Sequence, residues 1–91
     1  GDERSTDLFQ TILKLESVEE CEKFFRDLMS ISEIEAVVER WEVVKLVEQG
    51  MPYRKISEQT GASTATITRI AHWLKHGMGG YRQALDRKNL T

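Results

Sequence analysis

The chain has 91 residues, 13 lysines and arginines against 15 acids, and a single cysteine. This length allows one domain near the lower size limit for a self-sufficient core, which favours a core shared with a second chain. One cysteine excludes an intramolecular disulfide, and Cys21 is expected to be a buried structural residue in a reducing compartment. Without an apolar run long enough to span a membrane or a signal-like N-terminus, the protein is expected to be cytoplasmic.

One proline, six glycines and long amphipathic segments predict an all-α fold of about six helices. The first helix is expected over Asp7 to Leu15. Ser17 followed by Glu20 matches the capping-box pattern, so a second helix is expected from there to about Met29. The side chains expected to be buried on it are Phe24, Phe25 and Leu28.

A second capping-box pattern, Ser32 with Glu35, predicts a long third helix that runs to Gln49 and ends at Gly50. Its apolar side chains cover an unusually wide arc, formed by Ile34, Val37, Val38, Trp41, Val43, Val44, Leu46 and Val47. A surface helix of a small monomer needs only a narrower stripe, so we expect this helix to pack against its own subunit and against a partner. Residues 1–50 are therefore interpreted as a helical dimerisation part.

Two short amphipathic segments separated by Gly61 predict a helix-turn-helix within residues 51–76. Glycine accepts the left-handed backbone at a helix end, and Pro52 fits the first turn of the upstream helix, where a missing N–H costs nothing. Ser63 is a suitable N-cap for the second helix. The apolar residues expected to form one small core are Ile56, Ala62, Ile67 and Ile70.

The outer face of that second helix is polar, and its hydroxyl side chains and single arginine suit base edges in the major groove of DNA. The residues concerned are Ser63, Thr64, Thr66, Thr68, Arg69 and His72. An ordinary helical hairpin has the same periodicity, so the motif alone leaves both interpretations open.

Charge distribution favours DNA binding. Residues 1–50 carry six lysines and arginines against thirteen acids, whereas residues 51–91 carry seven against two. The basic charge therefore coincides with the motif and would supply sequence-independent phosphate contacts. The side chains expected to make these contacts are Arg54, Lys55, Arg69, Lys75 and Arg82.

Residues 77–91 are predicted to contain a glycine-rich break from Gly77 to Gly80, a short closing helix from Tyr81 to Leu85, and a frayed tail from Asp86. The whole chain is thus expected to be one domain.

Other chemistry has little support. His72 and His76 have the i, i+4 spacing of a metal-ligand pair, but no third ligand is nearby in the sequence and no H-E-x-x-H motif occurs. No catalytic triad or glycine-rich phosphate loop is recognisable either. We therefore expect no enzyme activity, no catalytic residue, no bound metal and no cofactor.

Several short segments occur together in one known family. They are Glu35-Ala36, Arg40, Gly61-Ala62, Ala65 to Arg69 and Leu74-Lys75. Together they resemble the bacterial Trp repressor superfamily, and more particularly its YerC/YecD branch, over roughly residues 29–77. The resemblance implies an intertwined all-α homodimer, in which the first three helices and the last interlock with the partner. Its two helix-turn-helix motifs would contact half-sites about 34 Å apart.

The resemblance also implies which residues contact DNA. The family positions that contact the groove correspond to Thr64, Ala65 and Thr68, and a basic contact on the first helix of the motif corresponds to Arg54. Ser57 stands where the family has a DNA-contacting lysine, so a different operator sequence is expected.

The corepressor pocket of the family holds the indole of L-tryptophan between two arginines, which correspond to Arg40 and Arg69, and Thr66 is kept as well. The family has glycine and serine where this chain has Ile70 and Trp73. Both changes add bulk and remove polarity, so we expect these two side chains to fill part of a pocket remnant that does not bind L-tryptophan. From the residues alone, Arg40 is expected to pair with neighbouring glutamates, and Trp73 to be core or filler.

Two functions from different classes stay open. The first is a homodimeric, sequence-specific DNA-binding transcriptional regulator, with repression as the expected effect and no response to L-tryptophan. The alternative is a helical protein-interaction module whose helix-turn-helix is structural and whose acidic N-terminal half binds a partner. Salt dependence separates the two, because only DNA binding releases counterions from phosphates.

Overall fold

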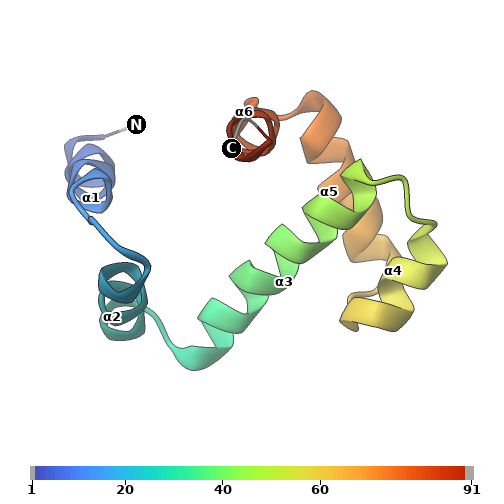
Figure 1. The fold of residues 1–91 in the computed structure, drawn as a ribbon, viewed down its shortest axis with the longest axis horizontal. Helices are drawn as coiled ribbons and strands as arrows, with labels where there is room; N and C mark the ends of the chain where they lie inside the picture. Colours follow the sequence, from blue (N-terminus) through green and yellow to red (C-terminus); the bar gives the residue numbers. More distant parts are fainter. Residues whose placement is uncertain (1, 90–91) are drawn as a thin grey trace. The chain divides into compact units, whose positions relative to one another are not determined.

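The computed structural model describes residues 2–89, which form six α-helices and no strand, so the predicted all-α fold is confirmed (Figure 1). The helices are α1 Glu3–Leu13, α2 Val18–Leu28, α3 Ile31–Glu48, α4 Tyr53–Thr60, α5 Thr64–His76 and α6 Gly80–Lys88. Two compact units divide the chain, one up to Ile34 and one from Glu35. Among the described residues, no helix combines the length and the apolar character needed to cross a membrane.

Side-chain caps determine where the helices of the first unit begin. Asp2 accepts a hydrogen bond from the Ser5 N–H at 2.8 Å, so α1 begins before the predicted Asp7, and it ends at Leu13. At the start of α2, the Ser17 hydroxyl accepts from the Glu20 N–H at 3.1 Å, as predicted. Ser17 forms its half of the predicted capping box, whereas the Glu20 carboxylate accepts from the Glu16 N–H at 3.4 Å. The Asp2 cap lay outside the apolar periodicity that predicted α1.

The N-terminus of α3 lies two residues earlier than the sequence predicts. The Ser30 hydroxyl accepts from the Glu33 N–H at 3.2 Å, and the Glu33 carboxylate accepts from the Ser30 N–H at 2.8 Å. The hydrogen bond from the Ser30 N–H to the carboxylate lowers the pKa of Glu33. The predicted box of Ser32 with Glu35 is wrong, because the pattern occurs twice in this stretch and the extended backbone at Met29 places Ser30 at the cap.

The first unit does not complete a core within one chain, because α1 and α2 hold no fully buried side chain. Predicted burial on α2 is wrong here: Phe24 and Phe25 are half-buried, packing edge to face with ring centroids 5.4 Å apart, and Leu28 is exposed. Cys21 is half-buried and free. The other exposed apolar side chains of this unit are Phe9, Leu13, Val18 and Ile31.

The core lies in the second unit and is shared by four helices. Its buried members are Val43, Val44 and Leu46 from α3, Ile56 from α4, Ala62 from the turn, Ile67 and Ile70 from α5, and Leu85 from α6. The predicted helix-turn-helix core is thereby confirmed, and the C-terminal half of α3 is the surface on which it packs. In Figure 1, α5 crosses this half of α3.

Only part of the wide apolar arc of α3 is used by this core. Trp41 and Val47 pack against it and are half-buried, but Val37 and Val38 are 54% and 56% exposed. The arc is therefore wider than the intrachain contacts require.

Gly61 ends α4 in the left-handed conformation, with φ +83°, and its N–H donates to the Ser57 carbonyl at 2.9 Å. Pro52 is the N-cap residue, one position before α4 rather than in its first turn. Ser63 caps α5 as predicted, accepting from the Thr66 N–H at 3.1 Å. The turn between the two helices is thus fixed by residues that the sequence identified.

Helix α6 is longer than the predicted Tyr81 to Leu85. The tail expected to fray from Asp86 is helical to Lys88, while residues 90 and 91 lie outside the described residues. Two contacts explain the difference: Leu85 is buried in the core, and Arg82 pairs with Asp86 one turn later at 3.2 Å.

Replacing Gly61 by alanine should destabilise the protein by about 1–2 kcal/mol, because a side chain penalises the left-handed backbone at this turn. Gly80→Ala is the matched control: Gly80 is helical, lacks a positive φ and has open space around its Cα, so this change should be neutral or slightly stabilising. Urea unfolding at one fixed subunit concentration measures both. Equal midpoints for the two variants would contradict the expectation.

Candidate nucleic-acid interface

Helix α5 has two distinct faces. Ile67, Ile70 and Ala71 are buried against the core. The exposed residues of the other face are Thr64, Ala65, Thr68, Arg69, His72 and Lys75. The predicted DNA-contacting residues of this helix are therefore gathered on one accessible side, with the exception of Thr66, which is half-buried.

Hydrogen bonds link three side chains along the first two turns of α5. The Ser63 hydroxyl accepts from the Thr66 N–H and lies 3.0 Å from the Thr66 hydroxyl, which accepts from the Arg69 guanidinium at 3.3 Å. These three residues stand three positions apart, on one side of the helix. The chain of bonds directs Arg69 toward the N-terminal end of α5, where the free N–H groups favour anions.

Thr68 is bonded differently from Thr66. Its hydroxyl donates to the Thr64 carbonyl at 2.9 Å, within the same helix. With its proton used in this bond, the hydroxyl keeps its acceptor lone pairs for an incoming donor, and its methyl group is left for apolar contact.

Helix α4 contributes basic side chains at the surface. Arg54 is 92% exposed and lies 3.7 Å from the Glu58 carboxylate, and Lys55 is exposed as well. Ser57 is half-buried. An ion pair this exposed contributes little stability, so it can exchange for another anion at small cost.

The residues of the predicted pocket remnant are placed unequally. Arg40 is exposed and makes no ion pair among the described residues; Glu42, one of its expected partners, pairs with Lys45 at 2.8 Å instead. Ile70 is only 3% exposed and belongs to the core. Trp73 is 58% exposed, so its expected core position is wrong within the single chain. Its ring makes an edge contact with His72 at 5.5 Å.

His72 and His76 have ring centroids 4.9 Å apart. Within residues 2–89, no group of three or more histidines, cysteines and acids is placed to hold a metal ion. Both histidines are exposed polar residues of α5.

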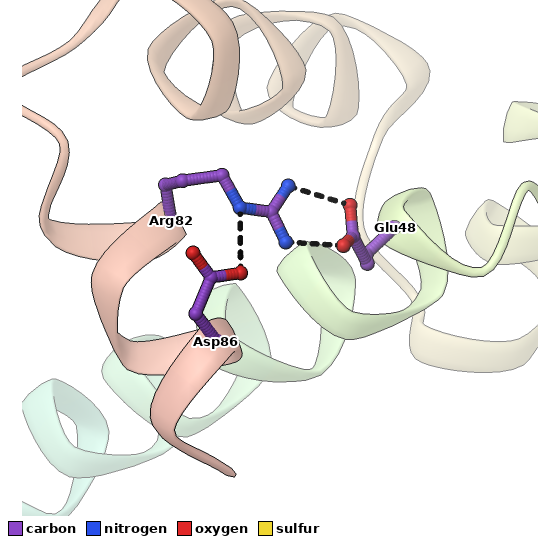
Figure 2. Close-up of polar contacts among 3 residues, drawn as sticks. All are labelled: Glu48, Arg82 and Asp86. Atoms are coloured by element: carbon purple, nitrogen blue, oxygen red, sulfur yellow. Dashed lines mark hydrogen bonds and ion pairs between the residues drawn. The ribbon is translucent and has the colours of Figure 1, made fainter. Parts of the chain in front are cut away.

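One polar cluster was not found by sequence reasoning. Arg82 donates one hydrogen bond to Glu48 Oε1 at 3.0 Å and a second, short one to Glu48 Oε2, and its Nε donates to Asp86 at 3.2 Å (Figure 2). The hydrogen bonds from Arg82 lower the pKa of Glu48, and those to Glu48 raise the pKa of Arg82. The predicted phosphate contact by Arg82 is not supported, because two carboxylates already hold its guanidinium. Only the i, i+4 spacing of Arg82 and Asp86 was visible in the sequence.

Comparison with known proteins places this geometry in a family. The model of the family described as Trp repressor protein matches residues 3–89. The chain is 48% identical over 84 residues to "Uncharacterized protein YerC" of Bacillus subtilis (strain 168), covering 92% of this chain and 81% of that protein.

Two solved structures of Trp repressor-like proteins are similar to this fold. A TrpR-like protein from Eubacterium eligens ATCC 27750 has a TM-score of 0.93 and 39% identity, with 97% of this chain and 91% of that chain covered. A candidate Trp repressor from Staphylococcus aureus has a TM-score of 0.92 and 41% identity, with 100% and 91% covered. This chain belongs to the Trp repressor family.

Proposed function

We propose that this protein is a homodimeric transcriptional regulator that binds a specific duplex DNA sequence through α5, with repression as its effect. The observation that carries the proposal is the exposed polar side of α5, held by a capped helix-turn-helix in a member of a repressor family. Because bacterial DNA lies in the cytoplasm, the protein would act there. Regulation, not catalysis, is the expected activity.

Base contacts are assigned to the first turns of α5. Thr64, Ala65 and Thr68 are exposed there and are small enough to approach base edges in the major groove. While the Thr68 hydroxyl donates to the Thr64 carbonyl, it can only accept from a base, so it favours the amino groups of adenine or cytosine.

Phosphate contacts are assigned to the basic side chains on both helices of the motif. Arg54 on α4 and Arg69 on α5 are exposed and bound only by weak surface contacts. The other residues proposed to lie near the backbone are Ser57, Ser63, Thr66, His72 and Lys75. Arg54, Arg69 and Lys75 supply three of the seven lysines and arginines of residues 51–91.

The homodimer is proposed from apolar surface that one chain leaves uncovered. Exposed apolar side chains occur on α1, on α2 and on the N-terminal half of α3, where Val37 and Val38 lie. A second copy offers the same surface, and a symmetric contact would bury it twice. The dimer would also supply two recognition helices to one operator.

We further propose that L-tryptophan is not the effector. Ile70 stands where the family has a glycine. Because its side chain is buried in the core, it cannot change conformation to make room for a ligand. Trp73 stands where the family has an amine-binding serine and offers no hydroxyl. Arg40 and Arg69 alone would not provide both the space and the polar contacts of a tryptophan site.

DNA binding is tested by selecting a preferred duplex from a random library and measuring affinity at several salt concentrations. Arg69→Ala should weaken binding to all duplexes, and the slope of log affinity against log salt concentration should fall by about one, the value for one lost phosphate contact. Thr68→Ala should instead reduce the preference for one base pair of the selected duplex by about 1–3 kcal/mol. Arg4→Ala is the control: it removes an exposed positive charge from α1, far in the sequence from α5, and it should change DNA affinity little. If no duplex is preferred at low salt, the alternative of a protein-interaction module is favoured.

Subunit association is tested by sedimentation and by unfolding at several concentrations. We expect a mass of two 10.5 kDa chains and an unfolding midpoint that rises with concentration, because folding and association are linked. A monomeric mass with a concentration-independent midpoint would contradict the dimer.

Calorimetric titration with L-tryptophan tests the proposed loss of the corepressor. No heat of specific binding is expected, and operator affinity should be the same with and without the amino acid, since Ile70 and Trp73 replace the small and polar residues of the family. Micromolar binding accompanied by tighter operator binding would refute this.

A further inference from the structure

The contact between Glu48 and Arg82 joins the two ends of the segment that contains the helix-turn-helix. Glu48 is the last residue of α3, and Arg82 lies in the first turn of α6, 34 positions later. Helices α4 and α5 both lie between them in the chain. Figure 2 shows the two side chains meeting between the end of α3 and the start of α6. Together with Leu85 in the shared core, this contact links the two helices that flank the helix-turn-helix.

Arg82 is held in one orientation. All three guanidinium nitrogens donate: two to the carboxylate of Glu48 and the third to Asp86, on the next turn of α6. Two parallel bonds from a planar guanidinium to one carboxylate restrict both distance and angle, which a single-point contact does not. The pair thus fixes how α6 meets α3.

Helix α6 is in turn coupled to α5 by a short connection. At Gly77, a Cβ atom would lie 2.5 Å from the Trp73 carbonyl oxygen, so the backbone passes directly against the end of α5. Gly79 has φ +89° and is the N-cap residue that precedes α6. With Leu85 buried in the core one turn beyond Arg82, a shift of α6 is transmitted to the C-terminal end of α5.

Leu85 packs α6 into the shared core, and the Glu48–Arg82 contact adds a polar link outside that core. An open depression of about 490 Å³ lies beside the ion pair, lined by Glu48, Lys75 and Arg82 among others. The pair therefore lies at the edge of a depression that is open to solvent, beyond the buried side chains of the core.

We infer that Arg82 and Glu48 are positioning residues for DNA recognition: their contact holds α6 to the end of α3 and thereby fixes the orientation of α5 without a bound ligand. Neither residue needs to touch DNA. The inference rests on the proposed DNA-binding function and adds to it the element that keeps the recognition helix in place.

The test compares Arg82→Gln, Glu48→Gln and the double variant. Each single change should weaken binding to the selected duplex by about tenfold, and the double variant should lose no more than either single variant, because one contact is removed in all three. A pure charge effect predicts opposite directions, since losing Arg82 removes a positive charge and losing Glu48 removes a negative one. Glu42→Gln is the matched control: its pair with Lys45 lies within α3, and affinity should be unchanged.

Amide hydrogen exchange supplies a readout that does not need DNA. In both single variants, exchange should become faster at the C-terminal end of α5 and through residues 77–82, with little change in the first turns of α5. Circular dichroism checks that helix content is kept. If the wild-type protein prefers no duplex, the proposed function fails while the exchange data still decide the role of Arg82. Unchanged exchange, additive losses, or opposite shifts in affinity would overturn the inference.

Discussion

The packing of α4, α5 and α6 on the C-terminal half of α3 is the constraint on which the rest of this structure depends. Val43 and Val44 of α3 are fully buried, as are Ile56 of α4 and Ile67 of α5. Because these contacts fix the inner side of α5, they also determine which residues are left outside. The polar side of the proposed recognition helix is thus a consequence of core packing, and Thr68 and Arg69 are exposed because their neighbours Ile67 and Ile70 are not.

The two units differ in how much of their apolar surface is buried within one chain. The unit from Glu35 has a core of buried side chains, whereas the amphipathic helices α1 and α2 of the unit up to Ile34 bury no residue. Acidic residues are concentrated in the first half of the chain and basic ones in the second. A protein with these properties would separate two tasks, association through the N-terminal helices and nucleic-acid contact through the C-terminal ones.

Local signals in the sequence were sufficient for the helix-turn-helix. Gly61 acts through its left-handed backbone and Ser63 through its capping hydroxyl, and the apolar spacing defines one core. The start of α3 was misplaced because Ser30 and Ser32 both fit the same local pattern. Two features had no local signal. The partner of Arg82 lies 34 positions away, and the exposure of Trp73 depends on which surfaces the fold brings over it. For Ile70, similarity to a family suggested a filled ligand site, whereas helical spacing predicted a core position, and the structure has Ile70 in the core.

The hydrogen-bonded series Ser63–Thr66–Arg69 has a thermodynamic consequence. These side chains form their bonds within the free protein, so the start of α5 is ordered before the proposed binding of DNA. Binding by a preformed helix loses little conformational entropy compared with a segment that folds on contact. The heat-capacity change of association would then report the apolar surface buried between protein and DNA, with no contribution from helix formation.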